Sequence, residues 1–271
     1  MKRALRIFTV ILVLIPVVLS IGYVASLSVD VEEISVGEND GTAIRIAHVS
    51  DLHYPHSFLS LSELATLLAE QTPDLIVFTG DIADGKATED DITALSALFS
   101  SVTALCPSFL VIGNHEIGSD HLNLFLETAR KSSVSVLLND VTTVSVHNTE
   151  ISVLGLSDGY PFVEKTLSSP LSIKNTPKIL LSHRPETFSD YVSAPESIRP
   201  NLIVAGHAHG GVARMGKLAL YAPNQGLFPK YTSGEYEKDN VTMIVSRGLG
   251  ASGMDFRCFN RYHLPVITWR I

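Results

Sequence analysis

Short apolar runs recur from residue 44 to the end of the chain, and they limit the folds open to it more than any other feature. Each run is rich in Val, Ile and Leu and has the length of a β-strand. The runs cover residues 44–50, 75–80, 109–113, 134–138, 151–157, 178–182, 202–206, 217–222, 241–246 and 264–269. Because such strands carry few polar side chains, we expect them to be buried on both faces.

Helical patterns separate the early runs. Residues 61–71 place apolar side chains at helical spacing, residues 90–105 begin with acidic residues that suit a helix N-terminus, and residues 120–131 form a third candidate helix. This order predicts an α/β fold of two packed, mixed β-sheets flanked by helices. We expect residues 44–271 to form this single domain, after a polar spacer at residues 30–43.

The N-terminal segment carries a different signal. Residues 7–29 contain no charged side chain, and Lys2, Arg3 and Arg6 precede them. A helix of this length reaches about 35 Å, enough to cross a bilayer core of about 30 Å. We therefore predict a transmembrane anchor within residues 1–29, in preference to a buried core helix. A cleaved signal peptide remains open, because small residues near positions 24–26 suit a peptidase.

The charges around this segment predict its orientation and exclude one class of partner. Basic residues before it and acidic residues after it favour a single pass through the cell membrane, with the rest of the chain extracytoplasmic. The chain has 20 Lys+Arg against 28 Asp+Glu and a formal net charge of -8. No nucleic-acid binding is expected, because that function needs a basic surface.

The cysteine count limits the choice of metal ligands. Cys106 and Cys258 are too few for a disulfide scaffold or a Cys-rich zinc module. The sequence leaves open whether they pair, and two separate buried thiols are the simpler expectation.

Side chains that bind metals follow five of the apolar runs. Because ligands of open α/β sheets bind beyond the carboxyl ends of the strands, these side chains are expected to meet at one shared site. They are Asp51 and His53, then Asp81, then Asn114 and His115, then His183, and finally His207 and His209.

The chemistry of this set predicts a metal-assisted hydrolase. Oxygen and nitrogen ligands without sulfur favour Mn, Fe, Zn or Co. The ligands are too many for one ion, whereas two ions about 3.5–4 Å apart, bridged by a carboxylate, would use them all. The sequence contains no serine-nucleophile elbow and no phosphate-binding P-loop. The residues alone leave the bond that is cleaved undetermined.

The order of the motifs resembles that of the calcineurin-like metallophosphoesterases. Asp-x-His, Gly-Asp, Gly-Asn-His-Glu, a lone His and Gly-His-x-His follow one another within residues 44–211. Residues 223–234 and 245–250 resemble the membrane-anchored or exported bacterial branch of that family. The resemblance implies two divalent metal ions, Mn, Fe or Zn. The first would be bound by Asp51, His53, Asp81 and His209, and the second by Asp81, Asn114, His183 and His207.

The resemblance also implies a mechanism. A hydroxide that bridges the two ions would attack phosphorus in line. His115 would protonate the leaving oxygen or stabilise the transition state, and Asp84 would orient His115. The expected substrate is a phosphodiester or pyrophosphate, with a lipid or cell-envelope molecule as a candidate. The alternatives are a noncatalytic metal-binding interaction module on the same fold and a metal-dependent hydrolase of another bond.

Other polar residues receive weaker expectations. Glu116 is interpreted as a loop carboxylate behind the ligands. Asp158 ends a strand, and the sequence leaves open whether it lines the cleft. Arg184 and Arg247 are candidate phosphate contacts, although surface arginines are common. His48, inside a strand, is expected to be structural.

Overall fold

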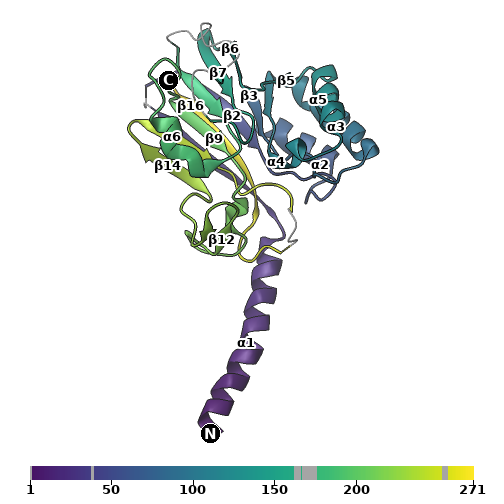
Figure 1. Ribbon diagram of the computed structural model, residues 1–271, viewed down its shortest axis with the longest axis vertical. Helices are drawn as coiled ribbons and strands as arrows, with labels where there is room; N and C mark the ends of the chain where they lie inside the picture. Colours follow the sequence, from purple (N-terminus) through teal and green to yellow (C-terminus); the bar gives the residue numbers. More distant parts are fainter. Residues whose placement is uncertain (1, 38–39, 162–165, 167–175, 252–255) are drawn as a thin grey trace.

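The protein has two six-stranded sheets packed face to face, with helices on the outside and one long helix that extends away from the domain (Figure 1). A computed structural model describes residues 2–37, 40–161, 166, 176–251 and 256–271, with only the backbone for residues 2–11. The predicted fold class of two packed mixed sheets flanked by helices is confirmed for the domain.

The first sheet has the strand order β1-β16-β2-β3-β4-β5. Its strands are β1 (Val29–Gly37), β2 (Ala43–Val49), β3 (Leu75–Thr79), β4 (Ser108–Val111), β5 (Ser135–Val136) and β16 (Tyr262–Arg270). The strands from β2 to β5 are parallel, β16 is antiparallel to β2, and β1 is parallel to β16. Every residue of β3 and β4 is buried, as their sequences predict.

Helices cover the outer face of this sheet. They are α2 (Leu61–Glu70), α3 (Glu89–Thr103) and α5 (Leu122–Lys131), close to the predicted ranges. The side chains of Ser60 and Thr88 accept hydrogen bonds from the backbone at the starts of α2 and α3, and Glu63 and Asp91 return the bond in capping boxes. These caps explain why both helices begin where they do.

The second sheet has the order β14-β15-β9-β8-β7-β6. Its strands are β6 (Asp140–Val146), β7 (Thr149–Gly155), β8 (Lys178–Leu181), β9 (Leu202–Ala205), β14 (Gly234–Lys238) and β15 (Val241–Val245). On its outer side lie the 3₁₀ turn η3 (Pro185–Thr187) and the short helix α6 (Phe188–Val192).

The core between the sheets joins alternate side chains of both. Val77 and Val111 of the first sheet belong to the same buried cluster as Val153, Leu181 and Val204 of the second. Because β2, β3, β4, β8 and β9 all end near the shared rim, this packing sets the loops after them side by side.

Two regions differ from the expected strands. Residues 217–222 do not form one strand but contribute to two small ribbons, β10 (Arg214–Met215) with β11 (Leu218–Ala219) and β12 (Tyr221–Ala222) with β13 (Gly226–Leu227). Residues 29–37, mostly within the expected spacer, form β1 and pair with β16 along its whole length. Residues 38–39 of that spacer lie outside the described part of the chain.

Helix α1 (Lys2–Ser26) leads into β1. Its described side chains between Leu12 and Val24 are largely exposed, and its last turn is tied to the domain because the backbone N–H of Asn260 donates to Ser26 Oγ at 2.9 Å. No helix among the described residues is both long and apolar enough to cross a membrane. The transmembrane helix predicted within residues 1–29 is therefore not supported by the structure.

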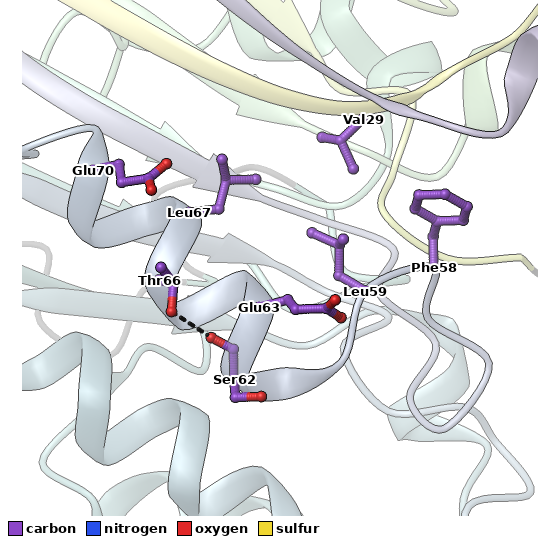
Figure 2. A pocket seen from close by; sticks show the side chains of 8 residues that line it. All are labelled: Val29, Phe58, Leu59, Ser62, Glu63, Thr66, Leu67 and Glu70. Carbon is purple, nitrogen blue, oxygen red and sulfur yellow. Dashed lines mark hydrogen bonds between the residues drawn. The ribbon is translucent and has the colours of Figure 1, made fainter.

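A groove and the two cysteines are further features of the domain. A groove of about 500 Å³ runs between Val29 and α2, and Figure 2 shows Phe58, Leu59 and Leu67 along it. Cys106 and Cys258 are separate free thiols, as expected, but only Cys258 is buried and Cys106 is half-buried.

Candidate metal centre

The loops after β2, β3, β4, β8 and β9 bring the candidate ligands together in two adjacent groups, and a third group, His53, Asp84 and His115, shares His53 with the first. Within each group, the metal-binding atoms all lie within 4.8 Å of one another. The first group is Asp51, His53 and His209, and the second is Asp81, His183 and His207. Both groups draw on both sheets, so neither sheet forms the site alone.

Asp81 lies between the two groups. Its Oδ2 atom is 3.1 Å from His183 Nε2 in the second group and 3.8 Å from His53 Nε2 in the first. A single carboxylate in this position can contact one ion on each side. Asn114 joins the second group, because its Oδ1 atom is 3.2 Å from His183 Nε2.

The nitrogen atoms within each group point at one another. His53 Nε2 is 3.3 Å from His209 Nε2, and His207 Nδ1 is 3.1 Å from His183 Nε2. Aromatic nitrogens converge in this way where their lone pairs share a cation. The mixed nitrogen and oxygen set, without sulfur, fits divalent ions such as Mn, Fe and Zn. The residues present therefore fit the metal ions that the resemblance implies.

Burial gives these charges large effects on one another. Burial raises the pKa of Asp51, and the nearby carboxylate of Asp81 raises it further. Burial alone would lower the pKa of His183, but its contacts with Asp81 and the charges of Asp51 and Asp158 together outweigh burial and raise the pKa to about 10. Burial and the charge of His183 lower the pKa of His207 to about 3. A site with so many buried ionisable groups is typical of a functional centre.

Hydrogen bonds behind the ligands fix their orientation. The backbone N–H of His207 donates to Asp51 Oδ1 at 3.0 Å, and Ser50 Oγ donates to Asp51 Oδ2 at 2.6 Å. His183 Nδ1 lies 2.8 Å from the carbonyl oxygen of Thr79, which holds the proton on Nδ1 and turns Nε2 toward Asp81.

Glu116 is a buried support for two of the ligand loops. Its Oε1 atom accepts from the backbone N–H groups of Ile82 (2.6 Å) and Ala83 (2.9 Å). Its Oε2 atom accepts from those of Asp81 (2.9 Å) and Gly113 (2.8 Å). The interpretation of Glu116 as a carboxylate behind the ligands agrees with these contacts, which tie the loop after β3 to the loop after β4.

Glycines let these loops approach closely. A Cβ atom on Gly206 would overlap Ser50 Oγ and Asp51 Oδ2, and one on Gly113 would overlap Asp81 Oδ1. Glycine at these two positions is therefore required by the ligands beside it rather than by turn conformation.

His115 and Asp84 lie beside the first group. Asp84 Oδ2 is 3.3 Å from His115 Nδ1 and 3.6 Å from His53 Nδ1. The backbone N–H of Gly85 donates to His115 Nδ1 at 3.1 Å. A neutral His115 therefore carries its proton on Nε2, the ring nitrogen on the other side from Asp84.

The two candidate arginines have different positions and partners in the structure. Arg247 forms an ion pair with Asp30 at 2.6 Å and lies 3.7 Å from Glu32, so it ties β1 to the loop after β15. Arg184 lies at the rim of the centre, where its Nη2 atom donates to Asp158 Oδ2 at 2.7 Å. Asp158 therefore binds Arg184 near the centre and does not join either ligand group.

Asn224 was missed by sequence reasoning. It follows the small ribbon strand β12, and its Nδ2 atom is 3.0 Å from His207 Nε2. The Pro-Asn-Gln-Gly string around it is visible in the sequence, but no strand pattern there indicates contact with a ligand 17 residues earlier.

Comparisons with known proteins agree with this geometry. The family model of the calcineurin-like phosphoesterases matches residues 44–211, a range that includes every candidate ligand. Phosphodiesterase YaeI of Escherichia coli K12 is 26% identical over 228 residues, which cover 82% of this chain and 81% of YaeI. Metallophosphoesterase YkuE of Bacillus subtilis 168 is 30% identical over 233 residues, which cover 83% of this chain and 78% of YkuE.

A solved structure shows the same fold. TT1561 of Thermus thermophilus superposes with a TM-score of 0.52 at 14% identity, over 77% of this chain and 91% of TT1561. The family match, the two relatives and the converging His and Asp side chains confirm the prediction of a metal-dependent phosphoesterase. The chain belongs to the calcineurin-like phosphoesterase family.

Proposed function

We propose that the protein hydrolyses a phosphodiester with two divalent metal ions, one at each ligand group. The observation that carries this proposal is the position of Asp81, whose Oδ2 atom is 3.1 Å from His183 Nε2 and 3.8 Å from His53 Nε2. A carboxylate in this position can contact an ion of each group. Asp51, His53 and His209 would complete one set, and Asn114, His183 and His207 would complete the other.

The ions would be Mn, Fe or Zn. When bound, they would activate water for attack on phosphorus and offset the charge of the phosphoryl oxygens. The chain itself orients its ligands through Ser50, Thr79 and Glu116, and it keeps water away from the buried side of the site by packing both sheets behind it.

His115 acts as the proton donor to the leaving oxygen. Gly85 occupies its Nδ1 atom, so the proton available for transfer is on Nε2. Asp84, whose Oδ2 atom is 3.3 Å from Nδ1, limits the orientation of the ring. The ring of His115 also packs edge-on against His53, with 4.4 Å between centroids, which holds it next to the first ligand group.

A phosphodiester is favoured over a monoester because YaeI, similar over most of the chain, is named a phosphodiesterase. A pyrophosphate is the second candidate. The exposed apolar side chains of α1, such as Leu12 and Val24, support attachment of the domain to a membrane. The basic residues before this segment and the acidic residues after it favour the extracytoplasmic side, and such attachment favours a lipid or cell-envelope substrate.

The test is hydrolysis of bis-p-nitrophenyl phosphate and p-nitrophenyl phosphate by the full chain in detergent, stripped of metal and then given Mn, Zn, Fe or Mg. We expect metal-dependent hydrolysis with preference for the diester. Asp81→Ala should lose about a thousandfold or more in kcat/KM, since it removes several kcal/mol of transition-state stabilisation. His115→Ala should lose roughly a hundredfold or more in kcat.

The exposed His147, in the turn between β6 and β7, provides the matched control, and His147→Ala should keep full activity. A fully active His115→Ala variant would contradict its role as proton donor. A folded protein that binds two ions and hydrolyses neither ester would contradict the proposed reaction.

A further inference from the structure

An exposed apolar surface covers the two small ribbons, β10 with β11 and β12 with β13, at the end of the domain from which α1 leaves (Figure 1). Large apolar side chains there are between 41% and 77% exposed. A cluster of this kind on a folded domain marks a surface that binds something. We call it the ribbon patch, and its residues are Met215, Leu218, Leu220, Tyr221, Leu227 and Phe228.

Backbone pairing joins the ribbon patch into one surface. Met215 lies opposite Leu218 in the first ribbon, and Tyr221 lies opposite Leu227 in the second. Side chains directly opposite each other on antiparallel strands lie on the same face. Leu220 links the two ribbons, because its backbone N–H donates to the residue before β10 and its carbonyl oxygen accepts from the residue after β13, both at 2.9 Å.

The ribbon patch adjoins the base of α1. The backbone N–H of Phe259 donates to the carbonyl oxygen of Gly22 in α1 at 2.9 Å. One residue earlier, the carbonyl oxygen of Cys258 accepts from the backbone N–H of Arg214 in β10, also at 2.9 Å. The exposed apolar side chains of α1 are therefore followed, at its base, by those of the ribbons. One extended apolar phase could contact both.

The charge around the ribbon patch is opposite in sign to that of the whole chain. Residues 212–234 contain Arg214, Lys217 and Lys230 but no Asp or Glu, whereas the chain has a formal net charge of -8. Lys217, in the turn between β10 and β11, and Lys230, two residues after the second ribbon ends in Phe228, are both exposed. Lysines beside apolar side chains suit a membrane surface, where the apolar groups enter the lipid and the ammonium groups stay among anionic headgroups.

The second ribbon also reaches the metal centre. Asn224 lies in its turn, and the Nδ2 atom of Asn224 is 3.0 Å from His207 Nε2. Leu227 follows three residues later, and three residues of chain span at most about 11 Å. A bilayer that contacts Leu227 would therefore bring its phosphate headgroups close to the second ligand group.

We propose that the ribbon patch enters the surface of a bilayer that contains anionic phospholipid, beside α1, and holds the metal centre next to the lipid headgroups. This inference goes beyond the proposed function, because docking requires no hydrolysis. It adds a second lipid contact to that of α1, and this contact fixes which side of the domain faces the membrane.

The test places a tryptophan in the ribbon patch of the full chain, reconstituted into vesicles of phosphatidylcholine and phosphatidylglycerol with or without bromine on the acyl chains. Bromine quenches a tryptophan that contacts the acyl chains. The single native tryptophan, Trp269, is buried in the core and gives a constant background. Phe228→Trp should lose most of its added fluorescence in the brominated vesicles and keep it in the plain ones.

Leu105→Trp is the matched control, at another exposed apolar residue. Leu105 precedes β4, so it lies at the opposite end of that strand from the ligand loop. Its added fluorescence should be the same in brominated and plain vesicles.

A charge variant tests the choice of lipid. In the Phe228→Trp background, Lys217→Glu should lower the ratio of quenched to unquenched tryptophan by roughly fivefold or more, because each basic charge near an anionic surface contributes about that factor. Vesicles of phosphatidylcholine alone should lower the ratio as well. Lys131→Glu, at an exposed position of α5, should leave the ratio unchanged.

Equal fluorescence of Phe228→Trp in brominated and plain vesicles would overturn this inference, as would equal quenching of Leu105→Trp or failure of the protein to float with the vesicles. Quenching that is insensitive both to phosphatidylglycerol and to Lys217→Glu would overturn the choice of an anionic surface. A protein that is quenched as expected but hydrolyses no ester would contradict only the proposed function. A protein that hydrolyses the diester without quenching would contradict only this inference.

Discussion

Five candidate ligands have positive φ angles: 49° at Asp51, 48° at His53, 52° at Asp81, 64° at His207 and 47° at His209. Residues other than glycine avoid this left-handed region at a cost of about 1 kcal/mol or more each. Surrounding contacts compensate for this cost. Hydrogen bonds to the carboxylates of these loops fix the strained loops to one another. These sharp turns let side chains at i and i+2 of one loop reach the same site.

At residue scale, Glu116→Gln tests how these loops are held. Both carboxylate oxygens of Glu116 accept two backbone N–H groups each, so an amide NH₂ would face two donors whichever way it turned. We expect a loss of about 2–3 kcal/mol in the free energy of unfolding and weaker metal binding, measured by urea denaturation and metal analysis. Glu127→Gln, at an exposed position of α5, is the control. A loss no larger than in that control would argue against the support role.

At the scale of elements, strand β2 contains a histidine that is buried within the domain. His48 is fully buried, and its Nε2 atom lies 2.7 Å from Thr79 Oγ1 on the neighbouring strand β3. Burial, together with the charge of His263, lowers the pKa of His48 to about 3. This position agrees with the expectation that His48 is structural. Because His48 is neutral in the folded protein, the stability of the protein should depend on pH.

The protein should lose stability as the pH falls below about 6.5, the ordinary histidine value. Between pH 6.5 and about 3, the unfolded chain binds a proton at His48 and the folded chain does not, so acid favours unfolding. This residue alone should lower the free energy of unfolding by about 2 kcal/mol at pH 5. Urea denaturation at pH 7, 6 and 5 measures the slope.

His48→Gln should flatten that slope by about one proton, because glutamine does not titrate. His56→Gln, at an exposed loop position, should leave the slope as in the unchanged protein. Equal slopes in the two variants would show that His48 titrates normally and would refute the assigned burial effect.

At the scale of the whole molecule, the metal centre joins the two sheets, because its ligands come from the loops of both. Ions that bind only the folded chain stabilise it by mass action, by about 2.7 kcal/mol for each site at a hundredfold excess over Kd. Removal of metal by a chelator should therefore lower the Tm in calorimetry, and readdition of Mn or Zn should restore it. An unchanged Tm, in a protein that metal analysis shows to be stripped, would mean that the sheets do not depend on the ions.

Local patterns predicted much of this molecule. The buried runs at β2, β3, β4, β8 and β9, the helices α2, α3 and α5, and the order of ligand residues after the strands could all be read from the chain. Strand and helix periodicity and the motif spacing are properties of a few adjacent residues. That is why the fold class and a metal-assisted hydrolase could be predicted from the residues, whereas the phosphoesterase reaction was implied by the resemblance of the motif order to a known family. The ligands assigned to each ion come from distant loops and remain predictions.

Contacts between distant segments were decided by the tertiary structure. The acidic stretch that reads as a spacer becomes β1 because β16, more than 200 residues later, offers a free edge. The same packing pairs Arg247 with Asp30, and it places Asn224 between Glu186 and His207. A sequence pattern specifies which residues can form a strand or a ligand, but the partner of each depends on which surfaces meet when the two sheets close on one core.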